Sequence, residues 1–262
     1  QVVYRVVEMT SSTDSSAAQI ERAIVIDPGF AAKILTHANS AHYALPRKVT
    51  SIREAVAFLG FRAVRQLAMA VGVFDLFVGK TDKESLRRRA WWRHSLDTAV
   101  CCRFLSDKLG LSVGDEVYTA GLLHFIGKTL MDRSSPAEYE KVMLLVEKGA
   151  TDLQAERAVF GCDHAEVGMA AAVRWGFPDV LVQGMDYLTE PKEGDPNAKV
   201  SALVSVGDHI ARIAAAGKES LACVSEAEHC WALQVLGISS EDFRLYVDDS
   251  IEAIAAAAVI SC

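Results

Sequence analysis

Apolar residues along the chain recur at the spacing of amphipathic helices. Between Ala55 and Phe74 they fall mostly three or four residues apart, which places them on one helical face. Gly60 interrupts this stretch and indicates a junction between two helices. Alternating β-branched runs bounded by Asn-Gly or Asp-Gly turns are absent, and only Gln1–Val7 could form an extended segment. The pattern predicts an all-α protein built as a two-lobed helical bundle.

Helix start signals recur at short intervals and support the same fold class. Each pairs a Ser or Thr, whose side chain can accept a bond from a free backbone amide, with an acid or amide three residues later. Two further starts place proline at the first helical position, after Asp27 and after Phe177. The predicted pairs are Ser51 with Glu54, Ser112 with Asp115, Ser135 with Glu138, Thr151 with Gln154, and Ser225 with Glu228.

The first third of the chain is basic and the remainder is acidic. Residues 1–90 hold 13 Lys and Arg against 8 Asp and Glu, whereas residues 91–262 hold 14 against 26. The charged stretch Lys80–Arg89 has few apolar anchors and indicates a boundary between lobes. We predict an N-terminal helical lobe over residues 1–84 and a larger C-terminal lobe over residues 85–262. The basic side chains of the stretch are interpreted as a solvated helix flank, with a positive binding face as the alternative.

Composition narrows the class of protein further. A chain of 262 residues, 51% hydrophobic and 23% charged, can bury its own core, which excludes disordered and disulfide-scaffold proteins. No apolar stretch reaches the roughly 18 residues that a membrane-spanning helix needs, and no signal peptide is evident. The six cysteines form no C-x-x-C pair, and the net charge of −7 argues against general nucleic-acid binding. We expect a cytoplasmic protein without membrane or nucleic-acid partners.

Four histidines lie in helical contexts, three of them beside carboxylates. Imidazole and carboxylate together are what a hydrolytic metal site requires, because they hold a divalent ion that acidifies a water. A single helical histidine is more often a hydrogen-bonded residue at a packing seam. Both alternatives stay open for His94 with Asp97 nearby, His124, His164 beside Asp163 and Glu166, and His209 beside Asp208.

Five sequence blocks in order resemble the HDOD domain. The first is Asp27–Gly60, which includes the element Ala38-Asn39-Ser40-Ala41. The later blocks are WRHS at residues 92–95, AGLLHFIGK at residues 120–128, FGCDHAEVG at residues 160–168 and WGFP at residues 175–178. The resemblance covers most of the chain, and its motif positions are Asn39, Ser40, Gly121, His124, Gly127, Trp175 and Pro178. Asn39 and Ser40 are interpreted as a helix–helix corner, because such side chains bond local backbone.

The resemblance implies an all-helical relative of the HD metal-dependent phosphohydrolases. Such domains occur in bacterial signalling and regulatory proteins, often as output domains and mostly without demonstrated catalysis. Carried over position by position, the resemblance gives His94 as the first metal ligand, His124 as the His of the His-Asp pair, His164 as an intermediate His and Asp208 as the late acid.

The departures from the HD pattern bear on activity. Phe125 stands where the pair requires its acid, and a phenyl ring can neither coordinate nor bridge two ions. Leu188 and Thr189 stand where related domains often carry two adjacent histidines. We therefore expect no catalytic residues, no bound cofactor and no metal at the vestigial candidates His94, His124, His164 and Asp208, with a single divalent ion as the alternative.

These observations predict a non-catalytic signal-transduction module. It would act through protein–protein contacts or by sensing a small ligand, with an input that shifts the lobes about Lys80–Arg89. Its partners would be signalling proteins, such as an attached or separate receiver, kinase or cyclase domain, and it could form a homo-oligomer. The alternative is a metal-dependent nucleotide phosphodiesterase that uses the reduced ligand set, with bound water as the nucleophile.

Overall fold

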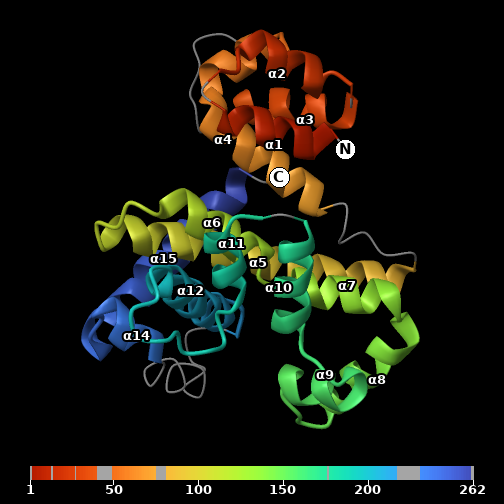
Figure 1. Ribbon diagram of the computed structural model, residues 1–262, viewed down its shortest axis with the longest axis vertical. Coiled ribbons are helices and arrows are strands. Elements are labelled where there is room, and N and C mark those ends of the chain that lie inside the picture. The colour runs from red at the N-terminus through yellow and green to blue at the C-terminus, as the bar shows by residue number, and fades with distance from the viewer. Residues whose placement is uncertain are drawn as a thin grey trace. The chain divides into compact units, whose positions relative to one another are not determined.

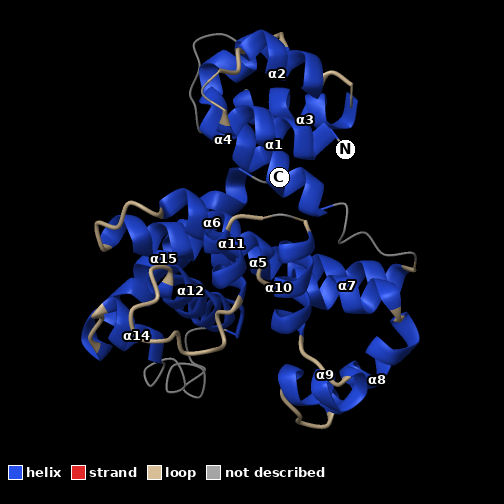
Figure 2. Cartoon of the chain, viewed as in Figure 1, coloured by secondary structure: helices blue, strands red, loops and turns tan. Residues whose placement is uncertain are grey.

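The described residues fold into helices joined by loops (Figures 1 and 2), which confirms the predicted all-α class. It divides into two compact units, Gln1–Leu76 with Ala258–Cys262 and Phe77–Ala257. In its described part, no helix is both long and apolar enough to cross a membrane. The computed structural model describes residues 2–12, 14–26, 28–39, 49–74, 81–175, 177–216 and 231–260.

The first unit packs four helices around one apolar core. The core draws Ile20 and Ile24 from the second helix, Ile34 from the third and Val56 from the fourth, and all four are fully buried. A capping box between Ser16 and Gln19 begins the second helix. The helices are α1 (Val2–Ser11), α2 (Ala17–Ile24), α3 (Pro28–Ala38) and α4 (Ile52–Phe74).

The stretch whose pattern allowed an extended segment, Gln1–Val7, is helical in its described residues. The described residues of Gln1–Val7 belong to helix α1, in which Val6 is fully buried and Val2 packs against the same core. The Thr10 hydroxyl donates to the Val6 carbonyl at 2.7 Å. Packing of one helical face against α4 outweighs the strand preference of the valines, because β propensity reflects the surroundings of a residue more than its backbone.

Two features of α3 and α4 bear on the sequence predictions, one at Gly60 and one at Asn39. Gly60 has a φ of +77° inside α4, so the predicted helix junction is confirmed as a kink. The Asn39 amide donates to the carbonyls of Leu35 at 3.0 Å and Val49 at 2.8 Å, and its oxygen accepts from the Val49 amide at 2.7 Å. Asn39 thus joins the end of α3 to the approach of α4. Ser40 lies outside the described residues.

The second unit is built around α5, which packs against α6 and α12. At Gly121 a Cβ atom would lie 2.9 Å from the Ala99 Cα, so α6 approaches the backbone of α5 more closely than a side chain permits. A smaller apolar cluster centred on Tyr139 lies among the helices that follow. The helices are α5 (Asp82–Lys108), α6 (Gly114–Leu123), α7 (Ile126–Ser134), α8 (Pro136–Glu147), α9 (Asp152–Phe160), α10 (His164–Arg174), α11 (Asp179–Met185), α12 (Ala198–Ala216), α14 (Trp231–Leu236) and α15 (Ser240–Ile260).

The capping predictions were partly right. Ser51 accepts from the Glu54 amide at 3.1 Å, and Thr151 forms a full capping box. Ser112 does not cap, because α6 begins one residue later than predicted, after Val113. Ser135 precedes α8 as expected, but its side chain makes no capping bond. Pro178 is the N-cap of α11 rather than its first helical residue, whereas Asp27 and the pair Ser225 and Glu228 lie outside the described residues.

The basic stretch is not a solvated flank along its whole length. Thr81 caps α5, and the predicted boundary between residues 84 and 85 falls inside this helix. Arg87 and Arg88 are largely buried and both pair with the buried Asp132 of α7. The prediction of solvation was wrong for these two arginines, because acids distant in sequence fold against them.

Candidate functional site

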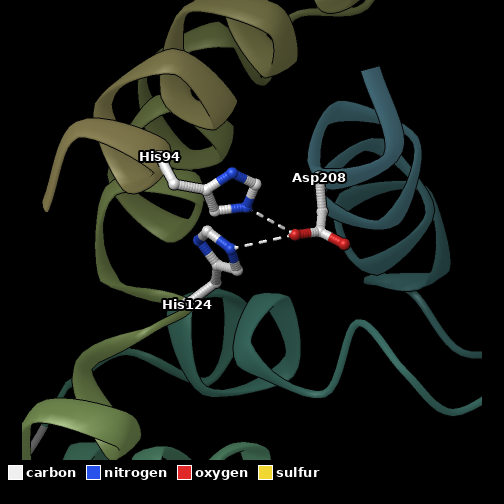
Figure 3. Close-up of side chains that lie close together, drawn as sticks. All are labelled: His94, His124 and Asp208. Carbon is white, nitrogen blue, oxygen red and sulfur yellow. Dashed lines mark hydrogen bonds and ion pairs between the residues drawn. The ribbon is translucent and has the colours of Figure 1, made fainter. Parts of the chain in front are cut away.

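Three of the four vestigial metal ligands meet at one point in the second unit (Figure 3). His94 projects from α5, His124 follows the last residue of α6, and Asp208 projects from α12. The Asp208 Oδ1 lies 2.7 Å from the His94 Nε2 and 3.4 Å from the His124 Nε2. The side chains are 15%, 0% and 3% exposed for His94, His124 and Asp208, so the cluster opens to solvent only beside His94.

The orientation of His124 leaves one ring nitrogen without a hydrogen-bond partner. Its Nδ1 lies 2.6 Å from the carbonyl of Gly121, which can only accept, so Nδ1 carries the proton. In the neutral ring the Nε2 then holds a lone pair, and this buried atom makes no hydrogen bond in the described structure. It faces the Asp208 Oδ1, which is also an acceptor. Two acceptors that face each other in a buried site favour a cation or a proton between them.

Burial and charge set the protonation of the cluster. Burial lowers the pKa of His124 to about 4, despite the nearby Asp208 carboxylate. Burial alone would raise the pKa of Asp208, but the charge of Arg212 and the hydrogen bond from His94 hold it well below its ordinary value. Arg212, one turn further along α12, donates from Nε to the Asp208 Oδ2 at 2.8 Å. At neutral pH His124 is therefore uncharged and Asp208 is anionic.

The ring of Phe125 fills the space between three imidazoles. Phe125 is the N-cap residue of α7 and follows His124 directly. Its centroid lies 4.7 Å from that of His94, in a stacked arrangement, and 4.2 Å from that of His124. On another side it meets His164 edge-on at 5.2 Å. Apolar carbon thus occupies the position from which an HD-type acid would reach a metal.

His164 is separated from the other three candidates, and both of its nitrogens are engaged. It is the first residue of α10, and its Nδ1 donates to the Glu156 Oε2 at 2.6 Å. Its Nε2 accepts from the Tyr187 hydroxyl at 2.9 Å. Burial lowers the pKa of His164, although the bond to Glu156 opposes this effect. His164 offers no free lone pair in this arrangement.

A buried lysine also lies against the phenyl ring of Phe125. The Lys128 Nζ is 4.3 Å from the Phe125 centroid and 2.7 Å from the Asp152 Oδ2, and the side chain is 2% exposed. Burial would raise the pKa of Asp152, but the charge of Lys128 lowers it overall. An ammonium group paired with a carboxylate therefore lies beside the aromatic ring.

The remaining sequence candidates are placed elsewhere. The His209 Nδ1 donates to the Ser205 carbonyl at 2.8 Å, and its ring is not part of the cluster. Asp97 accepts from Arg93 on the same helix at 2.9 Å. Asp163 and Glu166 form the capping box of α10.

Sequence reasoning gave no role to Arg212 or Lys128, and it did not predict that the hydroxyl of Tyr187 donates a hydrogen bond to a histidine of the site. Arg212 could have been found, because it stands four residues after Asp208 on a predicted helix. No local signal marks the other two, because their partners are distant in sequence. Tyr187 pairs with His164, 23 residues away, and Lys128 pairs with Asp152, 24 residues away.

The residues present fit one metal ion and do not fit two. The His94, His124 and Asp208 ligand atoms all lie within 4.8 Å of one another, and the His124 Nε2 is a buried donor atom without a partner. A second ion about 3.5 to 4 Å away would need a bridging carboxylate, and Phe125 supplies none.

An all-helical unit thus brings two histidines and an aspartate to one buried point, as the resemblance to HD-related domains implies. The family model of the HDOD domain matches residues 1–191. The chain belongs to the HDOD domain family, as the five sequence blocks indicated.

Similar proteins share this fold. The crystal structure of an HDOD domain protein of unknown function from Geobacter sulfurreducens has a TM-score of 0.76 at 26% identity, over 98% of this chain and 90% of that one. A candidate phosphohydrolase from Shewanella amazonensis SB2B has a TM-score of 0.73 at 25% identity, over 97% of this chain and 92% of that one.

A curated relative is much longer than this chain. An uncharacterised protein from Treponema pallidum (strain Nichols) is 24% identical over 204 residues, which are 71% of this chain and 37% of that protein. The chain thus spans little more than a third of the length of this relative.

Proposed function

We propose that the chain is a regulatory module of signal transduction that does not hydrolyse phosphate esters. The observation that carries this proposal is the ring of Phe125, which lies against His94, His124 and His164. Hydrolysis by two metal ions needs a carboxylate that bridges two dications against their mutual repulsion. Phe125 supplies no such carboxylate, and its ring lies against the histidines that would hold the ions.

The module acts through contacts with signalling proteins. HDOD domains occur as parts of longer chains, and the Treponema pallidum relative extends well beyond the matched region. The partner is a receiver, kinase or cyclase domain, on the same chain or on another. A small nucleotide that binds without turnover is the other input that suits such a module.

Incubation with Mn²⁺ or Fe²⁺ and a panel of phosphodiesters, including cyclic dinucleotides, is expected to release no product above the buffer rate. Product is measured by chromatography, since coloured substrates alone would miss nucleotide specificity. The paired variants Asp208→Asn and Asp97→Asn control for contamination, because both lose a carboxylate but only Asp208 belongs to the cluster. Turnover that disappears in Asp208→Asn and persists in Asp97→Asn would contradict the proposal. Thermal shift against the same nucleotides identifies a ligand that binds without reaction.

A second candidate function is that of a phosphohydrolase with one metal ion. The unpartnered His124 Nε2, which faces the anionic Asp208, favours this candidate. His94, His124 and Asp208 would hold the ion, which would supply a polarised water. The Asp208 carboxylate is not free to take the proton from such a water, because it is already bonded to His94 and Arg212.

Titration of metal-free protein with Mn²⁺ distinguishes metal binding at the cluster from binding elsewhere. If the second candidate is right, calorimetry gives one ion per chain, and His124→Ala weakens its affinity at least about tenfold. His209→Ala is the matched control, because His209 also lies on a helix but outside the cluster. Equal affinities in wild type and both variants would exclude this site as the metal site.

A further inference from the structure

We propose that Tyr187 is a second specificity-determining residue, which, together with Phe125, prevents a second metal ion from binding. Its hydroxyl occupies the only lone pair that His164 could offer to a metal. This inference rests on the proposed function, in which Phe125 removes the bridging acid. It adds that restoring an acid at position 125 is not sufficient to restore a two-metal site.

The bonds around His164 fix which nitrogen faces Tyr187 as an acceptor. Glu156 Oε2 accepts from both the His164 Nδ1, at 2.6 Å, and the His164 backbone amide, at 2.9 Å. Because a carboxylate bonded in this way only accepts, the proton of the neutral imidazole lies on Nδ1. Nε2 therefore holds the lone pair, and the Tyr187 hydroxyl, 2.9 Å away, donates to it.

Because these side chains are buried, a metal ion cannot easily replace the hydrogen bond between His164 and Tyr187. His164, Glu156 and Tyr187 are all essentially inaccessible to solvent. The second Glu156 oxygen accepts from the Tyr139 hydroxyl at 2.9 Å, so the carboxylate is held from α8 as well as from α10. A metal at His164 Nε2 would leave the Tyr187 hydroxyl without its acceptor, and in the described residues that hydroxyl makes no other hydrogen bond. An unpaired buried hydroxyl costs free energy that the metal bond would have to offset.

Tyr187 belongs to the apolar core of the second unit and also contacts the site. Its ring meets the ring of His124 edge-on at a centroid distance of 5.0 Å. It thereby contacts a residue of the three-ligand cluster and donates to His164, the separated fourth candidate ligand. Tyr187 and Phe125 thus both contact His164 as well as the three-ligand cluster. Tyr187 contacts His164 through its hydroxyl, and Phe125 contacts it through its ring.

The test counts Mn²⁺ ions per chain, by elemental analysis after dialysis and by calorimetry. Phe125→Asp is expected to bind no more ions than wild type. Phe125→Asp combined with Tyr187→Phe is expected to bind one more, at least about tenfold more tightly than the single variant, and His164→Ala added to it abolishes this gain. The matched control combines Phe125→Asp with Tyr139→Phe, which removes the other buried hydroxyl of the same hydrogen-bonded chain without freeing the His164 Nε2.

The outcomes separate this inference from the proposed function. A gain in Phe125→Asp alone, an equal gain in the Tyr139→Phe control, or no gain in the Tyr187→Phe combination would each overturn the role of Tyr187. Two ions in the wild type would instead overturn the proposed function. If Phe125→Asp does not fold, Tyr187→Phe alone decides: without metal, the ¹⁵N resonance of the His164 Nε2 should move toward that of a nitrogen that accepts no hydrogen bond, and an unchanged resonance would overturn the role of Tyr187.

Discussion

Gly127→Ala is expected to lower the free energy of unfolding by about 3 kcal/mol, the upper part of the range for overpacked sites. A Cβ atom at Gly127 would lie 1.9 Å from the carbonyl oxygen of His164 and 2.7 Å from its carbonyl carbon. Both atoms belong to the backbone of α10, so no side-chain rotation relieves the clash. Alanine stabilises a helix by about 0.5 to 1 kcal/mol relative to glycine. This gain offsets part of the cost of the clash, so the measured loss of stability is smaller than that cost.

Gly168→Ala is the matched control for this prediction. Gly168 lies on α10 in the same contact, but its Cβ would find its nearest neighbours, the Ile126 side chain and the Gly127 amide, at 3.6 and 3.7 Å. These are ordinary van der Waals distances, so the free energy of unfolding of the Gly168→Ala variant should differ from that of wild type by less than about 1 kcal/mol. Urea unfolding followed by circular dichroism measures both variants. Similar values for the two would show that α7 and α10 can separate without cost.

Much of the fold could be predicted from the sequence, because its signals are local. Helical spacing gave the fold class, and the single glycine at position 60 gave the kink in α4. Where local signals were ambiguous or misleading, tertiary contacts decided the structure. α1 is helical because Val6 is buried in a core formed by other helices. Ser112 does not cap because the helix begins at a later residue, and such shifts at helix ends depend on packing.

The candidate site was only partly accessible from the sequence. Family resemblance identified His94, His124 and Asp208, and the fold brings these three together. The same resemblance grouped His164 with them, whereas the structure separates it by the ring of Phe125. Hydrogen-bond partners such as Tyr187 follow from how α10 and the segment after α11 pack, which residue spacing does not encode. The chemistry of the site therefore depends on contacts that only the fold supplies.

Asp132→Ala is expected to destabilise the second unit by about 3 to 5 kcal/mol, the usual cost of removing one partner from a buried ion pair. The Asp132 side chain is fully buried and accepts from both Arg87 and Arg88 at the start of α5. Neither guanidinium can lose its proton at accessible pH, so both would keep their charge in a largely buried place. Arg88 would retain Glu84 as a weaker partner at 3.3 Å, and Arg87 would retain Glu140 at 2.6 Å.

Glu140→Ala tests whether burial, rather than charge alone, accounts for this effect. Glu140 also pairs with Arg87, but its side chain is 35% exposed, so water can replace it. Its loss should therefore cost no more than about 1 kcal/mol, as for other exposed pairs. Thermal and urea unfolding of both variants measure the difference. Equal losses would mean that the two acids act as interchangeable charges, and that the first turns of α5 are held against α7 by apolar contacts instead of by Asp132.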